Sequence, residues 1–312
     1  NEEHLFTLGD GLVTHNCRLR LDKRELRKRG GGLFGSAELT GSIGVVTLNM
    51  PRLGYLANDE KDFYTRLDYL MDLARDSLEV KRKVLTKNLA DGLYPYTKAY
   101  VSSFDNFFST LGVLGMNEAC RNLFGSDVNI GTEQGRKFAL DVLNHMRNRI
   151  ADYQVETGNL YNLESTPSES TCYRLALHDK KKYPDIITAG SDSDPYYTNS
   201  TNLPVGYTDD PWVAIEHQEP LQTAYNGGTV LHTFLGQQLE DADATKNFIK
   251  KVFENSRIPY LTISPVYSIC PIHGYLPGKQ ERCPKCREEQ VKAYKKKLSE
   301  LKKKKAELES IE

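Results

Sequence analysis

IGVVTLN, at residues 43–49, is the stretch that most clearly decides the fold class. It is rich in β-branched and apolar side chains, as a buried strand is, and Pro51 prevents the strand from continuing. A long amphipathic helix is predicted next, because positions 63, 67, 70, 74 and 78 are apolar and recur at helical spacing. A second helix is predicted to begin near Thr132, and further strands are predicted at residues 230–235 and 259–263. This alternation of strands and long helices indicates an α/β fold.

The composition excludes several classes of protein. With 312 residues and a formal net charge of −1, the chain is long enough to bury a large core in one or two domains. Its low mean hydropathy and the lack of a long apolar run predict a soluble protein without a transmembrane helix or a signal peptide. We expect a cytoplasmic location and no membrane partner. The near-neutral charge gives no reason to expect nucleic-acid binding. Six cysteines are too few for a secreted disulfide scaffold of this length.

Three of the cysteines lie close together near the C-terminus, in an arrangement typical of a metal site. Cys270 and His273 enclose two residues, as do Cys283 and Cys286, and a short connection containing Gly and Pro separates the pairs. Sulfur and nitrogen ligands at this spacing predict tetrahedral zinc. Four protein ligands leave no open position, so the zinc is expected to be structural. Two alternatives stay open: a different fourth ligand beside the three cysteines, and a free-standing zinc ribbon that binds nucleic acid.

His15, Asn16 and Cys17 form a group near the N-terminus with a chemistry of its own. An Asn side chain can attack its own main-chain carbonyl and cut the next peptide bond, while an adjacent His protonates the leaving amine. Cys17 can then accept an acyl group. Upstream, a Gly-Asp-Gly turn joins two short predicted strands. Residues 1–16 therefore resemble the C-terminal end of a protein-splicing intein, with the splice junction after Asn16. The alternative is a chance tripeptide, and without an N-terminal intein half we expect no unaided splicing.

Six further motifs are specific because they occur together and in a fixed order. They are GGGLFG (30–35), TGSIGVVTLNMPR (40–52), NLESTPSES (162–170), YTNSTNLPVGYTDDPW (197–212), YNGGTVLHTFLG (225–236) and TISPVYSICPIHGYLPG (262–278). With these motifs the chain resembles the C-terminal catalytic part of an anaerobic (class III) ribonucleoside-triphosphate reductase. The resemblance implies a ten-stranded α/β barrel of the glycyl-radical enzyme type, shared with pyruvate formate-lyase. Residues 17–264 would form roughly its second half, followed by a zinc-binding lobe at 265–286 and a charged helical extension at 287–312.

The resemblance also assigns candidate catalytic residues. Cys17 matches the family's thiyl cysteine at a loop tip, which abstracts the 3′-hydrogen of the ribose where water is excluded. Asn49 matches a substrate-facing asparagine whose amide can bond a ribose hydroxyl. Glu164 resembles an acidic residue that handles protons during loss of water. Gly227-Gly228-Thr229 can bind phosphate through backbone N–H groups. Each has an ordinary alternative: a packed thiol, a turn former, a solvated carboxylate or a plain turn.

The family implies partners and cofactors as well. Its substrates are ribonucleoside triphosphates, its reductant is formate or a thiol protein, and its dNTP and ATP effectors act through N-terminal regions outside this chain. A complete enzyme is expected to be a homodimer. Its glycyl radical is made by an S-adenosylmethionine iron–sulfur enzyme on a C-terminal segment with the consensus RVTGY, which does not occur here. We therefore expect a fragment that is inactive alone.

Three assignments stay open after this comparison of motifs. Many family members use four cysteines for zinc, so His273 is the less certain ligand. Cys120 and Cys172 match no motif and are expected to be packing residues. The alternative functions are another glycyl-radical enzyme of the pyruvate formate-lyase type, which is expected to lack the zinc ligands, and a non-catalytic zinc-stabilised interaction module.

Overall fold

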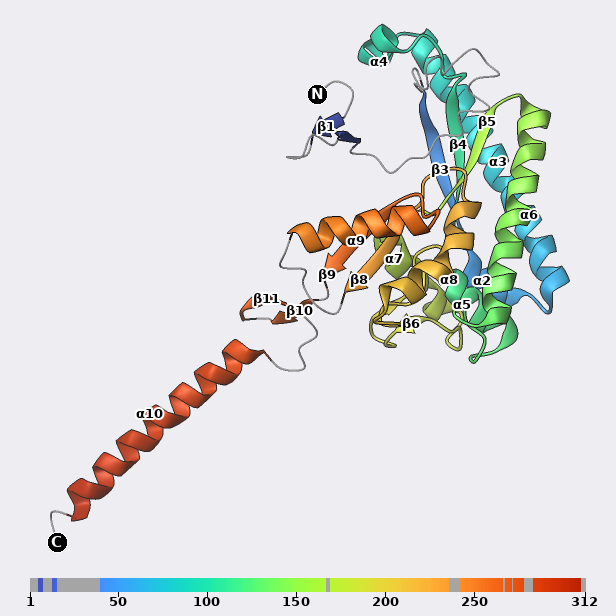
Figure 1. Ribbon diagram of the computed structural model, residues 1–312. Coiled ribbons are helices and arrows are strands. Elements are labelled where there is room, and N and C mark those ends of the chain that lie inside the picture. Colours follow the sequence, from blue (N-terminus) through green and yellow to red (C-terminus); the bar gives the residue numbers. More distant parts are fainter. Residues whose placement is uncertain are drawn as a thin grey trace.

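The computed structural model describes residues 40–166, 169–235, 242–265, 267–270, 272–277 and 283–309, together with two short strands at residues 5–7 and 13–15. Its centre is a parallel three-stranded sheet (Figure 1). The strand order is β3 (Gly41–Asn49), β4 (Phe107–Leu114) and β5 (Leu160–Glu164). All residues of β4 except the first are buried, as expected for a central strand of a parallel sheet.

β3 is less buried than its sequence predicts. Ile43 and Leu48 are buried, but Val45 is 43% exposed. Among the described strands β3 pairs with β4 alone, so one of its edges has no strand beside it there. Pro51 also does more than end the strand. It lies in the first turn of helix α2 (Met50–Leu56), where its fixed φ and missing N–H suit the start of a helix.

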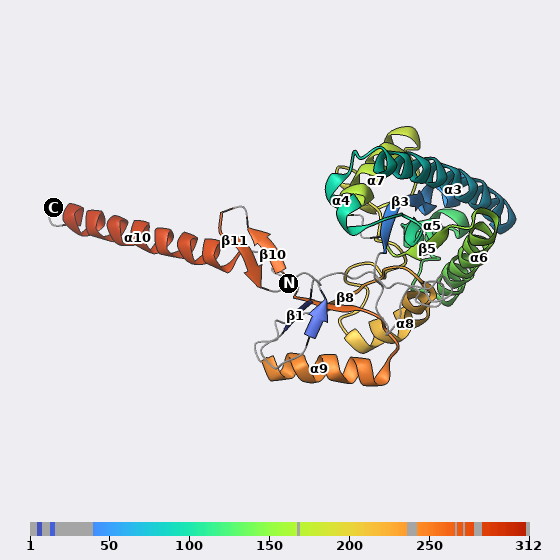
Figure 2. The same ribbon diagram turned by 90° about the horizontal axis from the view of Figure 1, so that it is seen from above.

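Two long helices cover one face of the sheet, α3 (Glu60–Ala90) and α6 (Glu133–Thr157) (Figures 1 and 2). The predicted apolar stripe of α3 is confirmed at buried positions 63, 67, 74 and 78, whereas Leu70 is partly buried against the same core. The predicted second helix, α6, buries positions 138, 142, 146 and 150. Thr132 caps α6 as predicted, because its side chain accepts a hydrogen bond from the Gly135 N–H at 3.1 Å. Each fully buried aliphatic side chain contributes roughly 1.5–3 kcal/mol, so these stripes hold the helices on the sheet.

A second group of elements lies beyond the carboxyl ends of these strands. A parallel pair is formed by β8 (Leu231–Leu235) and β9 (Leu261–Pro265), so the second predicted strand begins two residues later than residue 259. The helices of this group are α5 (Met116–Phe124), α7 (Glu169–Lys182), α8 (Pro211–Ala224) and α9 (Ala242–Asn255). Two small elements complete it, the strand pair β6 (Ala189–Gly190) and β7 (Pro195–Tyr196). A short helix α4 (Pro95–Tyr100) precedes β4.

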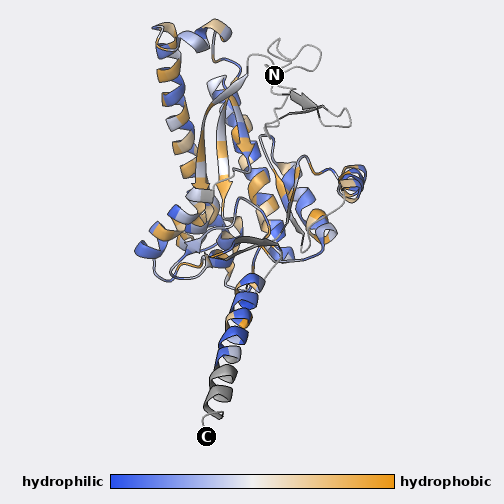
Figure 3. Ribbon diagram, turned by 90° about the vertical axis from the view of Figure 1, so that its left-hand side faces the viewer, coloured by the Kyte–Doolittle hydropathy of each residue, from blue (hydrophilic) through white to orange (hydrophobic). Residues whose placement is uncertain are grey.

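Both ends of the chain carry small antiparallel strand pairs. β1 (Leu5–Thr7) pairs with β2 (Val13–His15), in agreement with the strand–turn–strand prediction, but Asn16 and Cys17 lie outside the described residues. β10 (Tyr267–Cys270) pairs with β11 (Gly274–Pro277), and α10 (Pro284–Glu309) then extends away from the body as a largely hydrophilic helix (Figures 1 and 3). None of the helices in the described ranges is long and apolar enough to span a bilayer.

Candidate functional site

The carboxyl ends of the three parallel strands form the candidate site. Asn49 is the last residue of β3 and Glu164 the last residue of β5, and β4 joins the two strands in register. In parallel sheets, loops at the carboxyl ends of strands commonly carry the ligand-binding groups. The fold thus brings to one edge two residues that are 115 positions apart in the sequence. We call this edge, with the turn at residues 226–229 beside it, the strand-end site.

The Gly-Gly turn is bonded directly to the end of β5. The Gly227 N–H donates to the Leu163 carbonyl, and the Ser165 N–H donates to the Gly228 carbonyl, both at 2.8 Å. A Cβ atom at residue 228 would lie 3.0 Å from the Glu164 Oε1, and one at residue 227 would lie 2.8 Å from the Leu163 oxygen. The absence of side chains therefore allows this close approach. Because the Gly227 N–H is already bonded, the predicted phosphate contacts would have to come from Gly228 and Thr229.

Glu164 is not the solvated carboxylate of the alternative interpretation. It is buried, with 6% of its surface exposed, beneath the Gly-Gly turn. The structure thus brings together two of the predicted site elements, Glu164 and Gly227-Gly228-Thr229, although neither sequence motif predicts contact with the other. A buried carboxyl can exchange protons with a reacting group. The backbone N–H groups of the turn beside it can bind an anionic ligand.

Asn49 is held by a buried aspartate that sequence reasoning missed. Asp179 of α7 is fully buried, and its Oδ2 accepts hydrogen bonds from the Asn49 Nδ2 and the Tyr197 hydroxyl, each at 2.8 Å. Its Oδ1 accepts from the Arg52 Nε at 2.7 Å, and Arg52 Nη2 forms an ion pair with it. Burial, followed by the bond to Asp179, raises the pKa of Tyr197. This buried carboxylate therefore joins α7 to the end of β3.

The Asn49 side chain has two structural duties as well. Its Oδ1 accepts from the Arg52 N–H at 3.2 Å and caps α2, while Nδ2 donates to Asp179. A carboxamide nitrogen carries two hydrogens, so one N–H remains for a substrate hydroxyl. The sequence did contain a signal for Asp179, which lies at helical spacing from the apolar residues 172 and 176. The structure shows that all three lie on the buried side of α7.

A second buried carboxyl fixes the loop that faces the strand ends. Glu118 of α5 is fully buried and accepts hydrogen bonds from the Thr198 N–H at 2.9 Å and the Thr198 hydroxyl at 2.8 Å. Burial raises the pKa of Glu118, against the smaller effect of these bonds. Both cysteines expected to be packing residues are buried. Burial raises the pKa of Cys120 to about 12, and Cys172 donates to the Asn199 Oδ1 at 3.0 Å.

Three predicted zinc ligands lie together near the C-terminus. The ligand atoms of His273, Cys283 and Cys286 are all within 4.8 Å of one another, and we call these three residues the metal cluster. His273 Nδ1 lies 3.5 Å from the Cys283 sulfur and 3.3 Å from the Cys286 sulfur. Sulfur and nitrogen ligands around tetrahedral zinc are expected about 3.5 Å apart, so the donor set fits zinc. β10 ends at Cys270, opposite Gly274, but the Cys270 side chain lies outside the described residues.

The metal cluster includes a partner that the ligand spacing did not reveal. Glu289, on the first turns of α10, lies with its Oε1 3.1 Å from the His273 Nε2. Metal-binding histidines commonly donate their other ring N–H to a carboxylate, which fixes the ring orientation. The structure therefore points Nδ1 of His273 toward the two sulfurs. Among the described residues, this is the group whose geometry fits a metal ion.

Comparisons with known proteins show which family the chain resembles in sequence and in fold. The family model for anaerobic ribonucleoside-triphosphate reductase matches residues 7–297. The reductases of Haemophilus influenzae and Escherichia coli are each 26% identical to the chain, over 266 and 265 residues; each alignment covers 78% of this chain and 37% of the relative. The reductase of phage T4 is 26% identical over 216 residues, covering 62% of this chain and 33% of the relative. The chain thus spans about two fifths of the length of the curated relatives it matches.

Solved structures show the same fold. The anaerobic ribonucleotide reductase from Thermotoga maritima with MES in the active site superposes with a TM-score of 0.62 at 23% identity, covering 81% of this chain and 42% of that chain. The same enzyme with dATP bound in the specificity site gives a TM-score of 0.61 at 22% identity, covering 79% and 41%.

Proposed function

The chain belongs to the anaerobic ribonucleoside-triphosphate reductase family, and on that basis we propose that it is the C-terminal catalytic part of an enzyme that reduces ribonucleoside triphosphates to deoxyribonucleoside triphosphates. The observation that carries this proposal is the strand-end site, where Asn49 and Glu164 end two strands of one parallel sheet and the Gly-Gly turn is bonded to the end of β5. The three-stranded sheet and the β8–β9 pair would belong to the second half of a ten-stranded barrel.

We propose the following roles for the residues of this chain. Cys17, carried into the barrel on a finger loop, holds the thiyl radical that abstracts the ribose 3′-hydrogen. The remaining N–H of Asn49 bonds a ribose hydroxyl, and Glu164 handles the proton during loss of the 2′-hydroxyl as water. The backbone at Gly228 and Thr229 binds phosphate. The burial of Glu164 supports this role, because water is kept from the reacting groups.

The cofactors and partners follow from the same proposal. Structural zinc would be held by Cys270, His273, Cys283 and Cys286, and the fit of the metal cluster favours a reductase over an enzyme of the pyruvate formate-lyase type. The glycyl radical would lie on a further C-terminal segment and be made by an S-adenosylmethionine iron–sulfur enzyme. Formate or a thiol protein would supply the electrons, dNTPs and ATP would regulate through N-terminal regions, and the complete cytoplasmic enzyme would be a homodimer.

A substitution at Glu164 tests the proposed catalytic role. In an enzyme reassembled with the front half of the barrel and a glycyl-radical segment, Glu164→Gln should lower kcat by about a hundredfold, because the amide cannot exchange the proton. The glycyl-radical signal in electron paramagnetic resonance should be unchanged. Glu156→Gln, on the exposed side of α6, is the matched control and should keep full turnover. Full turnover by Glu164→Gln would remove Glu164 from the mechanism.

We further propose that residues 1–16 are an intein remnant that leaves by splicing at Asn16. Supplied with the missing intein half, the chain should lose residues 1–16 and join Cys17 to an upstream peptide. Asn16→Ala should block cleavage after residue 16, because no side-chain amide remains to cyclise. Mass spectrometry measures both products. Unchanged processing of the Asn16→Ala chain would refute the intein assignment.

A further inference from the structure

A polar pocket of about 330 Å³ is lined by residues of α6, β4 and β5 and by Asn226, and we call it the α6 pocket. Phe108 and Tyr161, each the second residue of its strand, place it at the amino ends of β4 and β5. The strand-end site lies at the opposite, carboxyl ends of these strands. The volume is within the range of roughly 300–1,000 Å³ that small-molecule sites occupy. The α6 pocket is therefore a candidate for a site of its own.

One wall of the α6 pocket is a polar face of the helix. The residues that form it follow one another at helical spacing: Asn144, Arg147, Asn148, Ala151 and Gln154. A polar helix face is usually a solvated surface. Here the first residues of β4 and β5 and the side chain of Asn226 form further walls, so the polar groups of α6 line a concave space.

Two amide side chains of the α6 pocket have a fixed orientation. The Asn226 Oδ1 accepts from the Leu163 N–H at 2.7 Å, and the Gln154 Oε1 accepts from the Tyr161 N–H at 3.1 Å. A backbone N–H can only donate, so the oxygen of each amide must be the atom that faces it. The NH₂ groups are then left for a ligand, and neither forms a hydrogen bond with another of the described residues. Both amides therefore call for an acceptor on that ligand.

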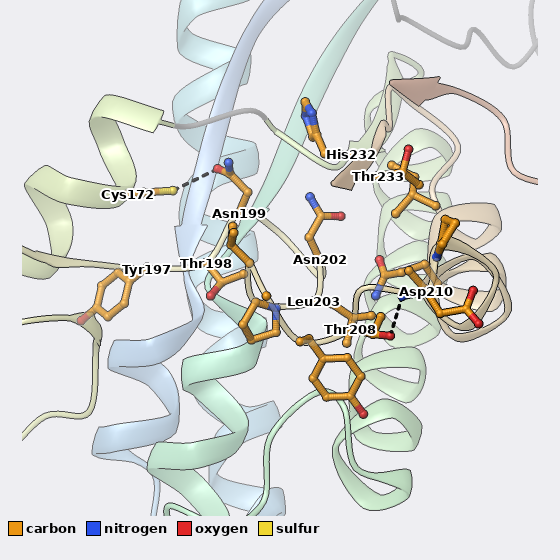
Figure 4. A pocket seen from close by; sticks show the side chains of 18 of the residues that line it. Cys172, Tyr197, Thr198, Asn199, Asn202, Leu203, Thr208, Asp210, His232 and Thr233 are labelled. Atoms are coloured by element: carbon orange, nitrogen blue, oxygen red, sulfur yellow. Dashed lines mark hydrogen bonds between the residues drawn. The ribbon is translucent and has the colours of Figure 1, made fainter. Parts of the chain in front are cut away.

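The charge of the α6 pocket favours an anion. Arg147 is partly buried and permanently positive, and the described residues that line the pocket include no aspartate or glutamate. Arg149, two positions further on, forms an ion pair with Asp72 at 2.8 Å, whereas Arg147 has no carboxylate partner in the part of the chain that the structure describes. The larger pocket beside the loop at residues 196–211 differs, because its described walls are mostly apolar and carry no lysine or arginine (Figure 4). The α6 pocket thus combines one cation with two oriented N–H donors.

We propose that the α6 pocket binds an oxyanion, which is the phosphate or carboxylate group of a small molecule. The Arg147 guanidinium supplies the charge and a planar set of donors, and the NH₂ groups of Gln154 and Asn226 bond the remaining oxygen lone pairs. Asn226 is also the first residue of the turn at residues 226–229, so a bound anion contacts the segment that reaches the strand-end site. The binding is separate from the proposed reductase reaction and does not depend on it.

NMR of the whole chain tests this inference without requiring turnover. The probes are sodium phosphate and sodium acetate, with sodium chloride at the same ionic strength as the reference. In isotope-labelled protein, the side-chain signal of Arg147 is identified by its loss in Arg147→Gln. That signal should shift saturably at millimolar probe concentration, together with the NH₂ signals of Gln154 and Asn226. A response to phosphate alone or to acetate alone supports the inference and identifies the source of the oxyanion.

Three variants locate the binding. Arg147→Gln removes the charge and should weaken binding about tenfold or more, measured from the NH₂ signals. Arg121→Gln is the matched control in α5, where the Arg121 Nε donates to the Ser126 carbonyl at 3.3 Å, and it should leave the affinity unchanged. Ala151→Trp fills the pocket from an exposed position on α6 and should abolish binding with Arg147 still in place.

The remaining outcomes overturn the inference. It fails if neither probe shifts the Arg147 signal, or if sodium chloride shifts it equally, which would show an adventitious ion only. It also fails if the affinity is unchanged in Arg147→Gln or Ala151→Trp, or is lost in Arg121→Gln. Circular dichroism checks that each variant is folded, and either Arg147→Gln or Ala151→Trp alone decides the matter. None of these results bears on whether the reassembled enzyme reduces nucleotides.

Discussion

The strand-end site and the metal cluster are positioned in opposite ways. Around the strand-end site, buried side chains such as Asp179 and Glu118 each bind groups from distant segments, inside a hydrophobic core shared by the sheet and its helices. In the metal cluster, His273, Cys283 and Cys286 lie within 13 residues of one another in the sequence and are partly exposed. The first site can keep its geometry without a ligand, whereas the second depends on the ion that its ligands would share.

Removal of the metal ligands should have the largest effect. We predict about one zinc per chain, and the double substitution Cys283→Ser with Cys286→Ser should abolish its binding, because structural zinc contributes roughly 10 kcal/mol in small domains. Elemental analysis of purified protein measures the zinc content. Cys120→Ala removes a buried thiol outside the metal cluster and should retain the metal. Zinc content unaffected by the double substitution would contradict the assignment, and would erase the contrast between the two regions.

The sequence predicted the local features of both regions better than the long-range ones. The two long helices and three of the predicted metal ligands depend on spacing within one segment, and the structure brings the members of each group together. Asp179 was missed because it binds Asn49 from 130 positions away. Gln218 and Gln222 of α8, whose buried amides bond each other at 3.0 Å, were missed because an amide in a helix gives no sign in the sequence of its bonding partner. The exposure of β3 could not be predicted, since edge and central strands can share one composition.

Loss of the buried carboxylate at residue 179 should have the next largest effect. Asp179→Ala leaves Arg52, Asn49 and Tyr197 without their acceptor and should lower the free energy of unfolding by about 3 kcal/mol. Asp185→Ala is the matched control, because Asp185 is an exposed acceptor for the Tyr55 hydroxyl at 2.7 Å and its loss should cost at most about 0.5 kcal/mol. Urea titrations followed by circular dichroism compare the two. Equal effects would mean that the strand-end site is held no more firmly than the surface.

The pH dependence of stability should change least, and its sign follows from burial. Burial lowers the pKa of His217 below 6.5, so the folded state favours the neutral ring. Its contribution is complete above the unfolded value and is lost as the pH falls through the folded value. The raised pKa of Glu118 acts in the opposite direction, because its contribution is lost as the pH rises through the folded value. The His217 Nε2 donates to the Ile130 carbonyl at 2.9 Å. His217→Gln can still donate there and should lose less stability than the unaltered chain between pH 7 and pH 5.

Urea titrations at several pH values isolate His217 by this difference. The metal cluster and Glu118 are present in both proteins, so their titration cancels in the comparison. A steeper loss of stability in His217→Gln than in the unaltered chain would show that the ring is not buried in its neutral form, and would contradict the donation from His217 Nε2 to the Ile130 carbonyl.

The central claim is that Cys17 accepts the acyl group in splicing and then carries the thiyl radical. Its most direct test is the Cys17→Ser enzyme after splicing and reassembly with the glycyl-radical segment, since serine can still accept the acyl group. Anaerobic turnover should be abolished, because a hydroxyl O–H bond is too strong for the glycyl radical to open, while electron paramagnetic resonance should still detect the glycyl radical. A Cys17→Ser enzyme that makes deoxynucleotides would contradict the radical role of Cys17.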